Sequence, residues 1–189
     1  MFDAPIINRI IFKAFHSIGI SVDKEKKHIE IIKGLFGSEN GKKVSLPYNV
    51  TAFKEYDFIT LTNKCKTNEN FYMDFKCGTF DVPNYGKITI KRAKSMLQES
   101  ALYIDNKKIP KDCCWRFRKN GDIFTKYNGG TKKLKDYLID KKIPVRSRDV
   151  LPVLAFKNEI LVIAGVEISD KVKVDETTRS IIKIEVERK

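Results

Sequence analysis

The chain has 189 residues, enough for one large domain or two small ones, and its 42% hydrophobic content allows a buried core. Its 37 Lys and Arg residues against 24 Asp and Glu residues give a net charge of +13, which favours polyanionic partners. The sequence shows no secretory signal and no apolar run long enough to span a bilayer, so we expect a cytoplasmic protein without a membrane partner.

The first forty residues predict two amphipathic helices. The first covers residues 5–18 and ends at Gly19, and Asp23 can cap a second helix that runs to about Phe36, with Gly37 after it. Two helices alone bury little surface, so we expect their apolar side chains to pack on the following region or on a second copy of the chain. These side chains include Ile6, Ile10, Phe15, Ile32 and Phe36.

From Lys42 the apolar residues alternate with a period of two, which predicts strands. The expected strands are 44–46, 51–56, 58–62, 71–75, 87–91, 101–104, 115–118, 153–156, 160–163 and 181–186, with a short helix at 131–140. We therefore expect an α+β fold in three parts. These are a helical hairpin (1–40), an antiparallel β-rich region (41–100) and a small C-terminal α+β domain (101–189).

The positive charge is concentrated in one block. Between Lys107 and Arg148 there are fourteen Lys or Arg residues and four Asp residues, a net charge of +10, whereas the rest of the chain carries only +3. Such a concentrated excess predicts a surface that binds a polyanion. The alternative interpretation is a solvated basic face that binds no ligand.

Within this block, a Gly-Gly turn precedes the predicted short helix. Thr131 can cap that helix, and Leu134, Tyr137 and Leu138 share one apolar face. Glycines before a cationic helix start suit a phosphate, because they leave backbone N–H groups accessible. We therefore predict a phosphate-binding turn at Gly129, Gly130 and Thr131.

The predicted strand Trp115–Arg118 alternates aromatic and basic residues. Arg116 and Arg118 share one face, and Trp115 and Phe117 share the other. In one interpretation the arginines are exposed to solvent and bind no ligand. In the other they lie beside the lysines of the 131–142 segment and bind phosphate oxygens. The predicted RNA-binding residues are Arg116, Arg118, Lys132, Lys133, Lys135, Lys141, Lys142, Arg146 and Arg148.

Residues suited to catalysis or metal binding do not form a recognisable motif. The two histidines, His16 and His28, lie in helical patterns, and the four cysteines, Cys65, Cys77, Cys113 and Cys114, lack C-x-x-C spacing. Asp122 follows Gly121 and is best interpreted as a turn former, while Asp136 and Asp140 are expected to pair with lysines. We predict no catalytic residue, no metal site and no cofactor bound by this chain.

Several segments together resemble one family. They are Asn128 to Pro152, Trp115 to Asp122, Glu159 to Leu161, Ala164-Gly165 and Ile168 to Asp170, and they cover roughly residues 100 to 187. The sequence there is similar to the C-terminal domain of the tRNA(Ile)-lysidine synthetases, the TilS family. A weaker similarity, at Ala4 to Gly19 and His28 to Glu30, is to the helical substrate-binding region that precedes that domain.

The resemblance implies tRNA binding by the C-terminal domain, at the acceptor-stem end, within an ATP-dependent ligase that attaches lysine to the wobble cytidine of tRNA(Ile). The family's Ser-Gly-Gly-x-Asp-Ser loop is absent from this sequence. We therefore expect the C-terminal part of a larger enzyme, not catalytic alone, with ATP bound by the N-terminal catalytic domain. Expected partners are tRNA(Ile) and that domain. The alternatives are a structural or dimerisation module of the same enzyme, as a homodimer, and a stand-alone RNA-binding protein.

Overall fold

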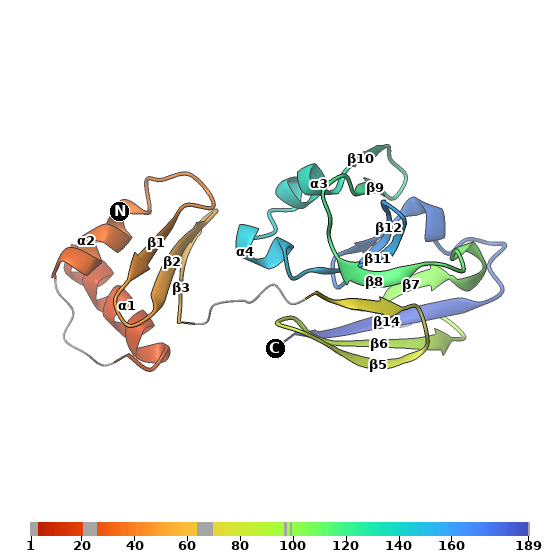
Figure 1. Cartoon of the computed structure of the whole chain (residues 1–189), viewed down its shortest axis with the longest axis horizontal. Coiled ribbons are helices and arrows are strands. Elements are labelled where there is room, and N and C mark those ends of the chain that lie inside the picture. Colours follow the sequence, from red (N-terminus) through yellow and green to blue (C-terminus); the bar gives the residue numbers. More distant parts are fainter. Residues whose placement is uncertain (1–3, 21–25, 64–69, 97, 99, 189) are drawn as a thin grey trace. The chain divides into compact units, whose positions relative to one another are not determined.

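The structure, a computed structural model, describes residues 4–20, 26–63, 70–96, 98 and 100–188 (Figure 1). The chain divides into two compact units, Met1–Lys66 and Thr67–Lys189. The α+β class expected from the sequence is confirmed, since both units combine helices with mostly antiparallel sheets.

In the first unit, two helices cover one face of a small sheet (Figure 1). The helices are α1 (Ala4–Ser17) and α2 (Lys26–Gly34), and the sheet has the order β1 (Lys43–Leu46), β2 (Val50–Glu55), β3 (Phe58–Thr62). Gly19 ends α1 with φ +79°, a conformation that glycine adopts at little cost. The expected Asp23 cap lies outside the described residues.

The predicted packing of the helices on the β region is confirmed for part of their apolar surface. Phe15 and Ile32 are buried against Leu46, Val50 and Ala52 of the sheet. In contrast, Ile6, Ile10 and Phe36 remain 47–54% exposed and do not pack on this sheet, so their packing on a second copy of the chain stays a prediction. The reason is geometric: α1 is apolar around more than one face, and one small sheet covers only one side of a helix.

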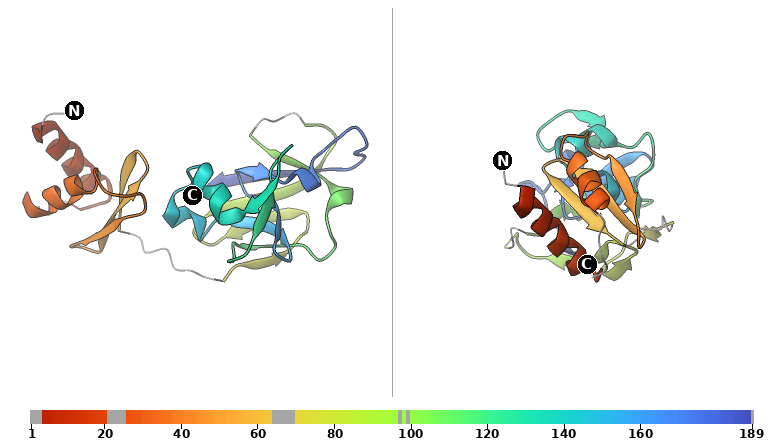
Figure 2. Two further views of the ribbon diagram at one scale, coloured as in Figure 1. Left: turned by 90° about the horizontal axis from the view of Figure 1, so that it is seen from above. Right: turned by 90° about the vertical axis from the view of Figure 1, so that its left-hand side faces the viewer.

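The second unit contains two sheets. The smaller one has the order β5 (Gly78–Val82), β6 (Gly86–Ala93), β14 (Ile181–Arg188), β7 (Leu102–Asp105), and all its pairs are antiparallel. The larger one has the order β10 (Thr131–Lys133), β9 (Ile123–Thr125), β12 (Glu159–Ile163), β11 (Pro152–Phe156), β8 (Cys114–Phe117), β4 (Tyr72–Asp74), and β13 (Glu167–Ile168) pairs with β12. Figure 2 shows this unit from two further sides.

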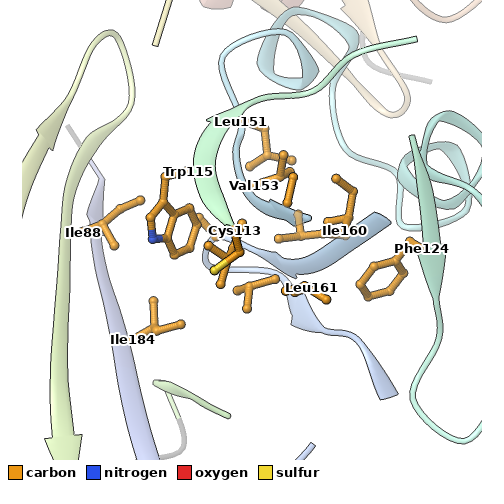
Figure 3. Packing of buried hydrophobic residues seen from close by; sticks show 14 of the residues in the cluster. Ile88, Cys113, Trp115, Phe124, Leu151, Val153, Ile160, Leu161 and Ile184 are labelled. Atoms are coloured by element: carbon orange, nitrogen blue, oxygen red, sulfur yellow. The ribbon is translucent and has the colours of Figure 1, made fainter. Parts of the chain in front are cut away.

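The two sheets of the second unit share one hydrophobic core. Trp115 of β8 is fully buried and lies between Ile88 of β6 and Ile184 of β14 on one side and the β11–β12 layer on the other (Figure 3). The short helices α3 (Leu134–Asp140) and α4 (Val145–Arg148) and the 3-10 turns η1 (Asn106–Lys108) and η2 (Asp170–Val172) complete this unit. As the alternation of residues along β8 predicts, the face of the strand that carries Trp115 points into this core.

The observed division of the chain differs from the three expected parts, 1–40, 41–100 and 101–189. Strand β14 pairs along all its residues with β6, so the β-rich residues 78–93 belong to the same sheet as the C-terminal strand. Strands β1 to β3, in turn, pack with the helices. Local alternation predicts strands, but it does not identify partners that are about ninety residues apart in sequence.

Gly86 provides a stability prediction. It has φ +142°, and a Cβ atom built there would lie 2.0 Å from the Glu187 carbonyl oxygen of the paired strand β14. We expect Gly86→Ala to lower the free energy of unfolding by on the order of 3 kcal/mol, because both the backbone conformation and the strand pairing are disturbed. Urea denaturation would measure this change. Gly130→Ala is the matched control, since its Cβ would meet open space, and equal stability of the two variants would contradict the prediction.

Candidate nucleic-acid interface

Arg116 lies inside the second unit and not on its surface. Its side chain is 5% exposed and forms a two-pronged ion pair with Asp122, with Nη2–Oδ1 at 2.7 Å and Nη1–Oδ2 at 2.9 Å. The guanidinium also donates to the carbonyl oxygens of Phe117 and Lys157, both at 2.9 Å. The prediction that Arg116 contacts RNA was therefore wrong. The strand face that carries Arg116 is covered by the turns that contain Asp122 and Lys157.

Asp122 closes the turn after β8, as expected for a turn former. Its backbone N–H donates to the Lys119 carbonyl oxygen, and its carboxylate accepts the Lys119 N–H at 2.6 Å. The same carboxylate is 2% exposed and binds Arg116. Sequence reasoning found the turn but not the ion pair, because an alternating strand does not show which residue will cover each face.

The α4 region also uses its arginines within the fold. Arg148 is 8% exposed, and its Nε donates to the Ile143 carbonyl oxygen at 2.8 Å. This burial leaves little of the Arg148 side chain exposed to an RNA, so the structure does not support the predicted contact. Arg146 is half-buried on the same helix, and Arg118 is half-buried and pairs with Asp149.

The predicted phosphate-binding turn has a different structure. Residues Thr131–Lys133 form strand β10, so α3 begins only at Leu134 and Thr131 does not cap it. The Thr131 hydroxyl instead meets the Thr125 hydroxyl across the hairpin, at 2.8 Å. The Asn128 and Gly129 N–H groups donate to Asp170 and Lys126. The turn therefore has a carboxylate beside it and two of its amides already in use, which argues against a phosphate cradle.

Helix α3 presents the predicted apolar face to the core. Leu134, Tyr137 and Leu138 are buried, and the Tyr137 ring lies 4.6 Å from that of Phe124. The Tyr137 hydroxyl donates to Glu167, which also binds Lys141 at 2.6 Å. Burial raises the pKa of Tyr137, and its hydrogen bond to Glu167 raises that pKa further.

Two of the predicted RNA-binding lysines are neutralised by carboxylates. Lys132 pairs with Asp140, and the hydrogen bond from Lys132 holds the pKa of Asp140 below its ordinary value. Lys141 pairs with Glu167, and its ammonium group lies 5.6 Å from the Tyr137 ring centroid. By contrast, Lys133, Lys135 and Lys142 are exposed, and none of them has an ion-pair partner within the part of the chain that the structure describes.

Two further lysines, which sequence reasoning did not select, lie beside the start of α3. Lys119 is exposed in the turn that Asp122 closes, and Lys157 is exposed in the turn between β11 and β12. The Asp122 carbonyl oxygen accepts the Leu134 N–H at 2.8 Å, and the Asn158 carbonyl oxygen accepts the Ile123 N–H at 2.9 Å. These bonds place three chain segments side by side.

We define the lysine cluster as Lys119, Lys133, Lys135 and Lys157. All four are exposed, and across the described residues no carboxylate pairs with any of them. Hydrogen bonds between the three segments that carry them hold these lysines in one part of the second unit, where their ammonium groups add to a local positive charge. Such a cluster can bind phosphate oxygens and release counterions from a nucleic acid.

Other classes of site find no support in the described residues. Within the described ranges, no group of three or more His, Cys, Asp or Glu side chains is arranged to hold a metal ion. Cys77, Cys113 and Cys114 are free thiols, and burial raises the pKa of the Cys113 thiol to about 11. A search of the described residues for a helix long and apolar enough to cross a membrane finds none.

Comparisons with known proteins agree on one family. Residues 113–185 match the family of the TilS substrate C-terminal domain. The tRNA(Ile)-lysidine synthase of Clostridium acetobutylicum is 35% identical, over 98% of this chain and 43% of the relative, and that of Clostridium tetani is 32% identical, over 96% and 42%. A crystal structure of a TILS C-terminal domain shares the fold, with a TM-score of 0.56 and 21% identity, over 64% of this chain and 98% of that one.

The fold and the matched residues define a TilS-type C-terminal domain within the second unit. The chain belongs to the tRNA(Ile)-lysidine synthase family and corresponds to the C-terminal portion of those enzymes. It spans less than half the length of the curated relatives that it matches.

Glu167 generates a prediction about pH. Burial alone would raise its pKa, but hydrogen bonds from Lys141 and Tyr137 lower the pKa below the ordinary value. A carboxylate with a lowered folded-state pKa contributes stability above its unfolded pKa of about 4.3, and this stability is lost as pH falls through the folded-state pKa. We therefore expect Glu167→Gln to reduce the fall in stability between about pH 5 and pH 3. Urea denaturation across that range tests this, with the exposed Glu176→Gln as control. The same pH dependence in both variants would contradict the prediction.

Proposed function

We propose that this chain binds tRNA through phosphate contacts made by the lysine cluster, and that it thereby positions tRNA(Ile) for a tRNA(Ile)-lysidine synthase. The observation that carries this proposal is the set of exposed lysines, without carboxylate partners, on three hydrogen-bonded segments. Three of them, Lys119, Lys133 and Lys135, lie in the sequence block with a net charge of +10, and Lys157 follows nine positions after that block. The relatives' name supplies the identity of the tRNA.

The chemistry of the cluster suits a tRNA stem. An A-form stem hides its base edges in a deep, narrow major groove, so proteins recognise it mainly through phosphates and 2′-hydroxyls. Lysines held by a rigid turn and by the start of a helix supply phosphate contacts of this kind. Phosphate contacts fix orientation but do not read sequence, so we assign affinity and positioning to this chain.

We further propose that lysine ligation to the wobble cytidine depends on the rest of the enzyme. In this proposal a cytoplasmic ligase binds ATP in another domain, and this chain is its tRNA-binding partner. The proposal rests on the family and on the absence of a Ser-Gly-Gly-x-Asp-Ser loop from this sequence. The alternative function is a structural or dimerisation module, which the exposed Ile6 and Ile10 of α1 favour.

The salt dependence of binding distinguishes these functions. A variant in which Ala replaces Lys119, Lys133 and Lys135 together should bind transcribed tRNA(Ile) more weakly than the parent chain. These replacements should also make the slope of log K, the binding constant, against log salt concentration shallower by about one unit for each lost phosphate contact. The variant should fold normally, because exposed lysines each contribute within about 0.5 kcal/mol to stability.

The matched control replaces Lys43, Lys87 and Lys94, three exposed lysines outside the cluster. It removes the same charge from the chain, so a general loss of attraction would affect both variants equally. If the cluster variant kept the parent's affinity and salt slope, the tRNA-binding proposal would fail and the structural module would be favoured.

The division of labour with the rest of the enzyme gives a second prediction. Purified chain incubated with ATP, lysine and tRNA(Ile) should form no lysidine and hydrolyse no ATP above the buffer background. The physical reason is that the sequence lacks the glycine-rich loop that would hold the phosphates of ATP. Mass spectrometry of the digested tRNA measures the product. Lysidine formed by this chain would place catalysis within it and refute the proposed division.

A further inference from the structure

The tip of the β9–β10 hairpin presents an aromatic side chain that the phosphate contacts do not use. Tyr127 is 49% exposed, although most other aromatic residues of this hairpin and of α3 are buried. The Lys173 ammonium group lies 5.4 Å from its ring centroid and covers one side of the ring. Lys173 therefore covers only part of the ring, and nearly half of the residue stays open to solvent.

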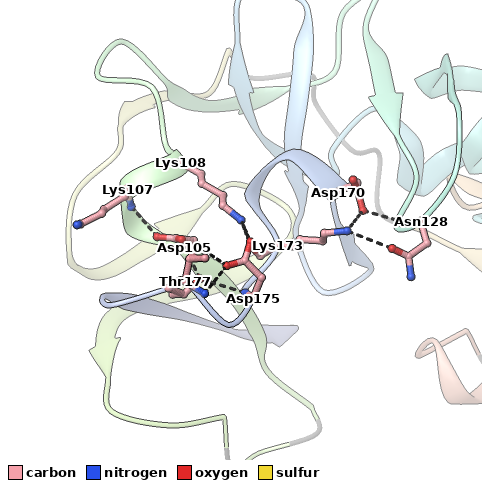
Figure 4. Close-up of polar contacts among 9 residues, drawn as sticks. Asp105, Lys107, Lys108, Asn128, Asp170, Lys173, Asp175 and Thr177 are labelled. Atoms are coloured by element: carbon pink, nitrogen blue, oxygen red, sulfur yellow. Dashed lines mark hydrogen bonds and ion pairs between the residues drawn. The ribbon is translucent and has the colours of Figure 1, made fainter.

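The hairpin tip is held firmly in place. The Asn128 N–H donates to the Asp170 carboxylate at 3.0 Å, and Lys173 bonds both Asn128 and Asp170, at 3.1 and 2.9 Å (Figure 4). The hydrogen bond from Lys173 keeps the pKa of Asp170 below its ordinary value, so this link is charged at neutral pH. A ring on a fixed support loses little conformational freedom when a ligand stacks on it.

One glycine of the turn leaves open space at the hairpin tip. Gly129 and Gly130 follow Asn128, and a Cβ atom at Gly130 would meet nothing within 4 Å. A flat ligand can therefore approach the hairpin tip without meeting side chains from these positions. This open space gives Gly130 a possible use other than the phosphate cradle that the sequence suggested.

The hairpin tip is connected to the lysine cluster through Lys133, which lies on the same hairpin. Lys133 pairs with Ile123 at the base, whereas Thr131 pairs with Thr125 next to the tip. At about 3.3 Å per residue, Tyr127 lies on the order of 10 Å from the base of the hairpin. An RNA whose stem phosphates lie on the cluster could therefore reach the ring with a few nucleotides.

We propose that Tyr127 is a stacking platform for an unpaired nucleotide that adjoins an RNA stem held by the lysine cluster. This proposal rests on the proposed RNA-binding function and adds a preference for a single-stranded end. Stacking between a base and an aromatic ring tolerates any base, so the preference concerns structure and not sequence. Positioning by lysines and stacking on Tyr127 together would select a stem next to unpaired nucleotides.

The test compares two RNAs, a stem-loop with a short single-stranded 3′ extension and the same stem-loop with a blunt end. The parent chain should bind the extended RNA roughly tenfold more tightly. Tyr127→Ala should remove this preference and leave the salt slope unchanged, because no phosphate contact is lost. Tyr127→Phe should keep the preference, as should Tyr72→Ala, a control at another exposed tyrosine of the same unit.

Fluorescence gives an independent measurement. The chain contains one tryptophan, Trp115, which is fully buried and supplies a constant background. In Tyr127→Trp, emission from the new indole should be quenched by the extended RNA and not by the blunt one. Quenching by both RNAs alike would show that the tip does not sense unpaired nucleotides.

The outcomes separate the two proposals. The stacking proposal is overturned if the parent chain binds the extended and the blunt RNA equally well. It is also overturned if Tyr127→Ala keeps the preference for the extended RNA or lowers the affinity for both RNAs equally. Loss of the preference in Tyr127→Phe would overturn it as well. In these cases, salt-dependent binding that requires the lysine cluster still supports the proposed function. If the affinity for neither RNA depends on salt concentration, both proposals fail.

Discussion

The buried ion pair between Arg116 and Asp122 is the interaction on which the basic end of the second unit depends. One guanidinium binds a carboxylate twice and two backbone carbonyl oxygens, and so joins strand β8 to the turns at Asp122 and Lys157. Removing two charges from water is costly, and these hydrogen bonds offset that cost. Loss of one partner would leave the other charge buried and unpaired, which typically costs about 3–5 kcal/mol.

The ion pair also determines which charges face the solvent. Because Arg116 and Asp122 neutralise each other inside the fold, they add no net charge to it, yet they fix the turn that carries Lys119. The Asp122 carbonyl oxygen in turn holds the first residue of α3, between Lys133 and Lys135. One buried cation therefore positions several exposed ones. A preorganised set of ammonium groups binds phosphates with less loss of conformational entropy than the same lysines on a mobile loop.

The sequence was informative where local chemistry decides the structure. Alternation and helical spacing predicted α1, β2, β8, β14 and the buried face of α3, because each pattern reflects one face turned toward a core. Thr131 misled the prediction, since pairing of β10 with β9 competes with capping and wins. Lys119 and Lys157 were missed because they are 38 positions apart in the sequence and become neighbours only through Arg116 and the Ile123–Asn158 hydrogen bond.

The basic block therefore divides into cations that hold the fold and cations that are available to a ligand. Arg116 and Arg148 are buried, and Arg118, Lys132 and Lys141 pair with carboxylates. The exposed lysines around α3 are the cations to which we assign the proposed phosphate contacts. Net charge thus overstates the size of an RNA-binding surface, because it counts both groups alike. A small cationic surface can orient a tRNA stem but cannot by itself select one. Discrimination then requires contacts of another kind, and the pinned aromatic ring at the tip of the same hairpin is placed to provide one.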